Sequence, residues 1–209
     1  MSELPLGAVE EDEAHCRRCG LWQTRTQVVV GRGSRAAQVM FLAEAPGREE
    51  DRSGLGFQGA AGTRFNEMLA FLGLDRDHIW LANAVRCRPT VDGKRNRAPR
   101  PEEIHACRHW LVRDIHQIRP RFVVTMGRIA FETLTQEAWD PSRRASPLHV
   151  DEFNLTAFAL YHPAYLIYRR DLFPTYRRDL VQLRQLLTQS QVPIGVAAGS
   201  WAFMEDTAD

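Results

Sequence analysis

Lysine and long apolar runs are almost absent from this sequence of 209 residues. Lys94 is its only lysine, and the other 26 basic residues are arginines. No stretch approaches the 18 consecutive apolar residues that a membrane-spanning helix needs. The first residues are acidic and lack the positive-then-apolar pattern of a secretory signal. We therefore expect a protein of the cytoplasm that does not associate with a membrane.

Net charge is also small, at +1, but the charges are unevenly distributed. Residues 1–13 hold five acidic side chains and no basic one, and residues 191–209 hold three acidic ones and no basic one. The segment between them has 27 basic residues against 18 acidic ones, a charge of +9. A basic body can bind a polyanion although acidic ends bring the total near zero. Arginine suits bidentate phosphate contacts, but GC-rich coding explains the same composition.

Short apolar segments alternate with helical patterns along the chain. The expected strands are Gln38–Ala43, Ile79–Ala82, Phe122–Met126 and Leu155–Tyr161. The expected helices are Gly62–Leu74, Pro101–Ile118, Arg128–Thr135 and 174–189. This alternation predicts an α/β fold with a parallel sheet covered on both faces. Residues 15–189 are expected to form one domain, between an acidic N-terminal arm (1–14) and a C-terminal tail (190–209).

Chemically distinctive residues follow the predicted strands, where parallel sheets gather their binding sites. Glu44 follows the first strand and could orient a water molecule or stabilise developing positive charge. Phe57 lies among glycines, outside any periodic apolar face, and could stack on a base. Asn83 ends the second strand and could bond a nucleobase edge. His162 follows the fourth strand and could donate a hydrogen bond to a developing anion.

Each of these residues also has a structural interpretation. The segment after Glu44 could be a solvated acidic loop with glycine turns, Asn83 a turn or capping residue, and His162 a core histidine. Residues 164–166 could be a wedge that enters a base stack, or part of the core. Residues 84–100 hold six bases and one acid, which suits either phosphate contact or a merely solvated loop.

Four cysteines complete the set of unusual residues. They are Cys16, Cys19, Cys87 and Cys107. In a chain without a secretory signal, a C-x2-C pair with two distant single cysteines is typical of a zinc site or an iron–sulfur cluster. The alternative is that the last two are buried thiols unrelated to the first pair. The spacing alone does not choose the metal.

Together these motifs resemble the family 4 uracil-DNA glycosylases, the iron–sulfur type of bacteria and archaea. The resemblance runs from about Cys16 to Leu187. The family's GEAPG motif, its acidic pair and its G-x-PFVG motif match Ala43–Gly47, Glu50-Asp51 and Gly54–Gly59. Its strand-end Asn with K/R-C-R-P, its R-N-x-x-P-x-P-x-E loop and its HP motif match Asn83–Pro89, Arg95–Glu103 and His162-Pro163. Its four cluster cysteines match the four cysteines of this chain.

The resemblance implies a three-layer α/β/α sandwich around a central four-stranded parallel sheet. It implies a structural [4Fe–4S] cluster on the four cysteines. It also implies a DNA repair enzyme that flips uracil out of DNA and hydrolyses its N-glycosidic bond, leaving an abasic site. The partner would be uracil-containing DNA, single- or double-stranded. We expect a monomer that acts in the cytoplasm of a bacterial or archaeal cell, associated with the nucleoid.

The resemblance also assigns roles to single residues. Phe57 would stack on the flipped uracil, Asn83 would bond its Watson–Crick edge, and Glu50 would exclude the methyl group of thymine. His162 would donate to the uracil O2 atom. Glu44 would hold water or balance positive charge on the sugar.

Four further residues would contact the DNA outside the base pocket. Tyr165 and Leu166 would fill the gap in the base stack, and the loop with Arg95 and Arg97 would grip phosphates.

Three positions depart from the family pattern beside the expected pocket: Ala43 replaces Gly, Gly56 replaces Pro, and Gln58 replaces Val. These departures leave two alternatives. One is a DNA-binding iron–sulfur protein of the same fold that has lost its activity. The other is a glycosylase whose specificity has shifted to another deaminated base.

Overall fold

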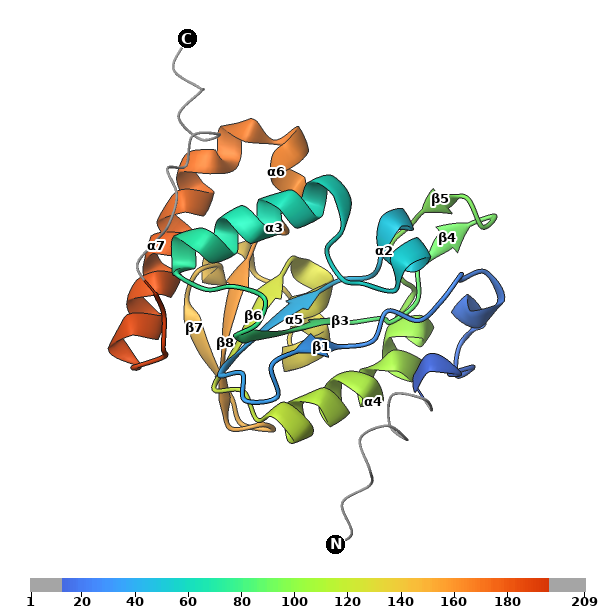
Figure 1. Cartoon of the computed structure of the whole chain (residues 1–209), viewed down its shortest axis with the longest axis horizontal. Coiled ribbons are helices and arrows are strands. Elements are labelled where there is room, and N and C mark those ends of the chain that lie inside the picture. Colours follow the sequence, from blue (N-terminus) through green and yellow to red (C-terminus); the bar gives the residue numbers. More distant parts are fainter. Residues whose placement is uncertain (1–12, 196–209) are drawn as a thin grey trace, which may run out of the picture.

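A six-stranded sheet forms the centre of the molecule, which we describe over residues 13–195 in a computed structural model (Figure 1). The strand order is β1-β3-β2-β6-β8-β7. The four inner strands run parallel and are β3 (Ile79–Asn83), β2 (Val39–Ala43), β6 (Phe122–Met126) and β8 (Leu155–Leu160). The edge strands β1 (Arg32–Gly33) and β7 (Pro147–Val150) pair antiparallel. The four predicted parallel strands are confirmed, but the sheet has more than four strands, because two short and largely exposed strands without an apolar pattern extend its edges.

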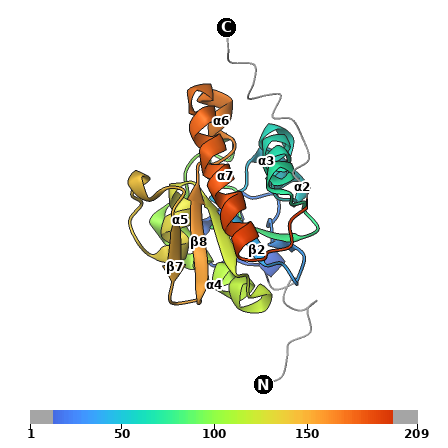
Figure 2. The same ribbon diagram turned by 90° about the vertical axis from the view of Figure 1, so that its left-hand side faces the viewer.

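Helices cover both faces of the sheet (Figure 1, Figure 2). α3 (Gly59–Leu72) and α7 (Phe173–Gln189) lie on one face, and α4 (Pro101–Ile118) and α5 (Arg128–Thr135) lie on the other. Successive β2 residues alternate between the two apolar cores: Phe41 packs with α3 and α7, whereas Met40 and Leu42 pack with α4 and α5. This alternation follows from the pleat of a strand. The predicted three-layer sandwich is confirmed.

Shorter elements form the loops around the ends of the strands. They are η1 (Gly20–Gln23), α2 (Arg48–Ser53), β4 (Thr90–Val91), β5 (Arg95–Asn96), η2 (Pro141–Arg143), α6 (Tyr165–Tyr168) and η3 (Arg170–Leu172). β4 and β5 form an antiparallel hairpin within the basic loop that follows β3. Asp92 and Gly93, in the three-residue loop between the two strands, both have a positive φ, and the N–H of Lys94 donates to the carbonyl of Val91 at 3.1 Å. Part of the basic loop is therefore a short hairpin.

The predicted arm and tail fall partly within the described residues. Glu13, from the acidic arm, is buried, and its carboxylate pairs with Arg86 at 2.8 Å. Val192, from the tail, is buried in the core with α3 and α7, and the N–H of Gly195 donates to the carbonyl of Gly73 at 2.8 Å. Residues 1–12 and 196–209, the rest of both segments, lie outside the described residues. Within residues 13–195, no helix is long and apolar enough to cross a membrane.

Candidate active site and cysteine cluster

The predicted site residues Glu44 and Asn83 lie side by side at the carboxyl edge of the sheet. Ala43 and Asn83 are register partners on β2 and β3. Pairing continues beyond both strands, because the N–H of Val85 donates to the carbonyl of Glu44 at 3.2 Å. Two segments 39 positions apart in the sequence are thereby fixed at one end of the sheet, as parallel sheets require of their binding sites.

Glu44 is half-buried and has a perturbed carboxyl group. Burial raises its pKa, and the positive charge of Arg128 at the start of α5 partly opposes that shift. Arg128 itself pairs with Glu132 at 2.9 Å. A carboxylate whose pKa is raised toward neutrality can accept a proton from water, which fits the predicted role of Glu44.

Asn83 is 7% exposed at the end of β3. Its backbone carbonyl accepts a hydrogen bond from Arg86 at 3.2 Å. Its side-chain amide makes no hydrogen bond with any of the residues described. A fixed backbone and an amide whose donor and acceptor are both unused suit the recognition of a polar ring edge.

Phe57 lies in an aromatic stack. Its ring stacks on Phe65 of α3 with centroids 4.2 Å apart, and it lies nearly parallel to the ring of His162, 5.4 Å away at 14°. Phe57 is 6% exposed and belongs to the core between the sheet, α3 and α7. Although Phe57 lies outside any periodic apolar face of the sequence, it has a role in the core, and Phe65 supports one of its faces. The stack still brings the predicted platform beside the predicted hydrogen-bond donor.

Glu50 braces the loop that carries Phe57. Its carboxylate accepts hydrogen bonds from the backbone N–H of Gly47 at 3.1 Å and of Gln58 at 2.7 Å. The first bond is the capping interaction at the start of α2, and the second reaches eight residues along the chain. Both oxygens are therefore held in place, and the position of Glu50 relative to Phe57 is fixed.

His162 is placed as a neutral hydrogen-bond donor. Its Nδ1 atom accepts a hydrogen bond from the backbone N–H of Ala164 at 3.1 Å. Burial lowers its pKa to about 4, so the ring is neutral at pH 7. A neutral imidazole that accepts at Nδ1 carries its proton on Nε2, and that N–H is available to a ligand.

The four residues predicted to contact DNA separate into two groups. Arg95 is exposed on β5, and Tyr165 is 42% exposed on α6. Arg97, in contrast, forms a two-pronged pair with Glu103 at 2.6 and 2.8 Å. Leu166 is 2% exposed and belongs to the core with α3 and α7.

Two of these residues, Arg97 and Leu166, are therefore engaged within the protein itself. Arg97 braces the hairpin against the first turn of α4, because a buried carboxylate holds its guanidinium. Leu166 packs inward because the short α6 turns its neighbours toward solvent. Of the α6 residues, Tyr165, Ile167 and Tyr168 are exposed, and Tyr168 is the most exposed at 83%.

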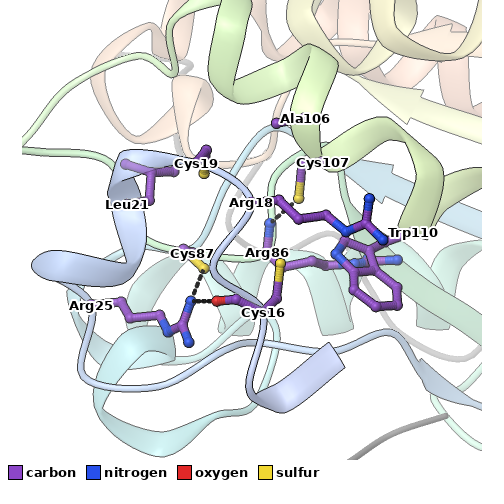
Figure 3. Close-up of a pocket in the computed structure, with 10 residues that line it drawn as sticks. All are labelled: Cys16, Arg18, Cys19, Leu21, Arg25, Arg86, Cys87, Ala106, Cys107 and Trp110. Carbon is purple, nitrogen blue, oxygen red and sulfur yellow. Dashed lines mark hydrogen bonds between the residues drawn. The ribbon is translucent and has the colours of Figure 1, made fainter. Parts of the chain in front are cut away.

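The four cysteines line one small hollow (Figure 3). Cys16 and Cys19 come from the N-terminal segment, Cys87 from the loop after β3, and Cys107 from α4. Arg25 donates to the Cys87 sulfur at 3.4 Å, and the backbone N–H of Arg86 donates to the Cys107 sulfur at 3.2 Å. Burial raises the pKa of Cys87 to about 11 and that of Cys107 to about 12, so the free thiols would stay protonated at pH 7.

The donor set around this hollow fits an iron–sulfur cluster. Within residues 13–195, no three Cys, His, Asp or Glu side chains are grouped tightly enough to hold a single metal ion. Four thiols that line one hollow, two of them receiving hydrogen bonds, form a donor set of the kind that iron–sulfur clusters use.

Sequence reasoning missed the role of Arg86, which it placed in a basic loop. Arg86 is fully buried and pairs with Glu13 and with Asp114 of α4. The same residue donates to the Asn83 carbonyl and, through its backbone, to Cys107. It thus links the cysteine cluster to the edge of the sheet. The only signal in the sequence was an arginine within the run Ala84–Cys87 of otherwise apolar residues.

Comparison with known proteins places this site in context. A family model described as the uracil DNA glycosylase superfamily matches residues 30–184. The chain is 38% identical to a type-4 uracil-DNA glycosylase of Archaeoglobus fulgidus, over 84% of this chain and 90% of that protein. It is 35% identical to one of Sulfurisphaera tokodaii (87% and 84% covered) and 34% identical to one of Thermotoga maritima (78% and 83% covered).

Proposed function

This chain belongs to the uracil-DNA glycosylase superfamily and to its type-4 enzymes, and we propose that it removes uracil from DNA by hydrolysing the N-glycosidic bond. The observation that carries the proposal is the neutral imidazole of His162 beside the Phe57 ring. A duplex hides the glycosidic bond, so the uracil nucleotide must leave the base stack to reach these side chains.

Recognition of uracil is proposed to depend on three side chains. The Phe57 ring, supported by Phe65, offers a face on which a planar base can stack. The unused amide of Asn83 can donate to a uracil carbonyl oxygen and accept from the uracil N3–H, a pairing that cytosine cannot reproduce. The carboxylate of Glu50, held by two backbone N–H groups, is proposed to crowd the ring at its 5-position and exclude the methyl group of thymine.

Bond cleavage requires stabilisation of charge on both fragments. As the bond between the sugar carbon and the uracil nitrogen breaks, its electron pair goes to the base, and negative charge grows on the uracil O2 atom. The Nε2–H of His162 donates to that oxygen. Water attacks the sugar carbon, and the Glu44 carboxylate orients the water and accepts its proton. The products are an abasic site and uracil, which then takes up a proton.

Contacts with the DNA backbone and base stack are proposed for the exposed residues around the pocket. Arg95 lies on the hairpin, where its exposed guanidinium could bind a phosphate. Tyr165 is proposed to enter the gap left by the flipped nucleotide, together with Tyr168 in place of the buried Leu166. We propose a monomer that acts on single- or double-stranded DNA in the cytoplasm, at the nucleoid of a bacterial or archaeal cell.

The cysteine cluster is proposed to hold a [4Fe–4S] group on Cys16, Cys19, Cys87 and Cys107. When bound, this group would cross-link the N-terminal segment, the loop after β3 and α4. Arg86, beside the cluster, keeps Asn83 in place because its side chain donates a hydrogen bond to the Asn83 carbonyl. The proposed role is structural, and base removal uses only the side chains described above.

The proposal is tested with a panel of oligonucleotides that carry uracil, thymine, cytosine, hypoxanthine or xanthine, each single- and double-stranded. Alkaline cleavage after incubation reveals abasic sites. Release of uracil but not thymine or cytosine supports the proposal. Salt-dependent DNA binding without product from any base, at stoichiometric protein, refutes it. Release of another deaminated base without uracil contradicts the proposed specificity.

A further inference from the structure

Phe57 occupies a backbone conformation that its side chain disfavours. Its φ angle is +51°, in the left-handed region, where a bulky residue is a strained outlier. This conformation presents its ring to both Phe65 and His162. Surrounding contacts must hold such a conformation, because the isolated loop would relax to a negative φ.

Arg76 makes the contacts that hold this turn. It follows the end of α3, and its Nη1 atom donates to the carbonyl of Gly56 at 2.9 Å while its Nη2 atom donates to the carbonyl of Phe57 at 2.7 Å. Its Nε atom donates to the Asn66 side chain at 2.8 Å, which fixes the guanidinium from the other side. All three nitrogens of Arg76 are thus engaged inside the protein.

Two neighbours complete the clamp. The Gln58 side chain donates to the same carbonyls of Gly56 and Phe57, at 3.2 and 3.3 Å. Gly62 in α3 lets the turn approach closely, because a Cβ atom at that position would lie 2.2 Å from the Phe57 carbonyl oxygen. Gly56 adds no stiffness, since glycine is the most flexible residue. The side chains of Arg76 and Gln58 therefore supply the rigidity that the loop sequence lacks.

We propose that Arg76, assisted by Gln58, is the positioning residue for the base-stacking platform. This inference rests on the proposed function, in which Phe57 stacks on uracil. Arg76 acts through the backbone of the turn, because its guanidinium fork bridges two adjacent carbonyls. Lysine, with a single ammonium group on a flexible stem, cannot reproduce this fork. Arg76 also lies 5.5 Å from the ring centre of Phe65, so it supports both rings of the stack.

The test compares wild type with Arg76→Met, Arg76→Lys, Gln58→Val and a control, Arg143→Met. Arg143 forms an exposed ion pair with Glu137, remote from the clamp in the sequence. Three quantities are measured: amide hydrogen exchange of the segment 54–62, the single-turnover rate of uracil release, and the affinity for DNA that carries a stable abasic-site analogue. The analogue has no base to stack, so its binding reports DNA contact without the platform.

For Arg76→Met we expect exchange in 54–62 at least ~10-fold faster, a uracil-release rate ~10-fold or more lower, and unchanged analogue affinity. Arg76→Lys should resemble Arg76→Met, Gln58→Val should show smaller changes in the same direction, and Arg143→Met should match wild type. Unchanged exchange, an unchanged rate, or a parallel loss of analogue affinity would overturn the inference. If the wild type released no uracil but Arg76→Met still exchanged faster in 54–62, the proposed function would be refuted and only the structural role of Arg76 in the turn would be confirmed.

Discussion

The backbone N–H of Ala164 donates to Nδ1 of His162 at 3.1 Å, which orients the imidazole and assigns its proton to Nε2. The bond joins two residues of the segment between β8 and α6, so the ring orientation depends on the local turn. Burial keeps this ring uncharged at pH 7. A neutral imidazole can stabilise a developing anion by donating a hydrogen bond and still keep its proton, because its N–H is a far weaker acid than that of an imidazolium.

The first prediction concerns the pH dependence of uracil release. With a pKa of about 4, His162 stays neutral from pH 6 to pH 8, so we expect the single-turnover rate to show no loss as pH rises through 6.5. Below about pH 5, protonation of His162, and of Glu44 with its raised pKa, should lower the rate. A rate that falls as pH rises through 6.5 would show that an imidazolium is required instead.

Substitution of His162 gives the second prediction. His162→Ala should lower the rate by about 100-fold or more, as loss of one preorganised donor does in other sites. Its matched control is His78→Ala, which removes an exposed histidine paired with Asp75.

The same substitution should also change the pH dependence of stability. Because folding lowers the His162 pKa, the unfolded chain binds more protons than the folded protein between about pH 4 and 6.5, and the free energy of unfolding should rise with pH in that range. His162→Ala should lose this dependence.

Asn83 carries the third prediction, on base recognition. Asn83→Ala removes the amide that faces the proposed pocket, and we expect a decrease of two or more decades in uracil release. Binding of abasic-analogue DNA should be retained, because the amide contacts only the base. Gln182→Ala, at an exposed amide on α7, serves as the control. A near-wild-type rate in Asn83→Ala would reject the assigned role.

The two hairpin arginines should behave differently, which is the fourth prediction. Arg97→Ala leaves the buried Glu103 carboxylate without its partner, and we expect a loss of about 1–3 kcal/mol in unfolding free energy. Arg95→Ala should leave stability unchanged but weaken DNA binding and reduce its salt dependence by about one phosphate contact. Thermal unfolding and binding at several salt concentrations distinguish the two. If Arg97→Ala weakened DNA binding as much as Arg95→Ala and did not destabilise the protein, Arg97 would be a phosphate contact.

The pH dependence of stability gives an independent check on the Arg97–Glu103 pair. Although burial alone would raise the Glu103 pKa, its hydrogen bond with Arg97 holds that pKa below the ordinary value. A carboxyl group with a lowered folded-state pKa contributes stability above its unfolded pKa, and the contribution is lost as pH falls. The difference in unfolding free energy between wild type and Arg97→Ala should therefore shrink below about pH 4.5.

The fifth prediction separates the core residue of α6 from its exposed neighbours. Leu166→Ala should cost about 2–4 kcal/mol of unfolding free energy, because it leaves a cavity in the core. Tyr168→Ala and Tyr165→Ala should leave stability nearly unchanged and lower uracil release from double-stranded more than from single-stranded DNA. The measurements are thermal unfolding and paired rates on both substrates. If the two tyrosine variants released uracil at equal rates from double-stranded and single-stranded DNA, a role of these tyrosines as a wedge in the base stack would be contradicted.

Strand and helix positions followed from the sequence because they depend on local apolar periodicity. β2, β3, β6 and β8 were each predicted within one residue at either end, and α5 was predicted with its observed bounds. β1 and β7 were not predicted, because a two-residue edge and a polar edge carry no such periodicity. The hairpin formed by β4 and β5 was expected only as a rigid basic loop.

The candidate site divides in the same way between local sequence and tertiary structure. Glu44, Asn83 and His162 could be identified because each follows a strand, and strand ends in parallel sheets meet at one edge. The four cysteines could be identified because few residue types bind metal. These predictions depended on the residue types of the site residues and on the position of Glu44, Asn83 and His162 at the ends of predicted strands.

Contacts that local periodicity does not encode decided everything else. Arg97 and Leu166 look available in the sequence, but Glu103 holds the first and the core with α3 and α7 encloses the second. Arg76 and Arg86 look like ordinary surface bases, yet one clamps the Phe57 turn and the other is fully buried. The sequence by itself determined the layers of the fold and the chemistry of the site, because both depend on residue type and local period. Only the tertiary structure decided which arginines face solvent, because that depends on specific partners that local periodicity does not reveal.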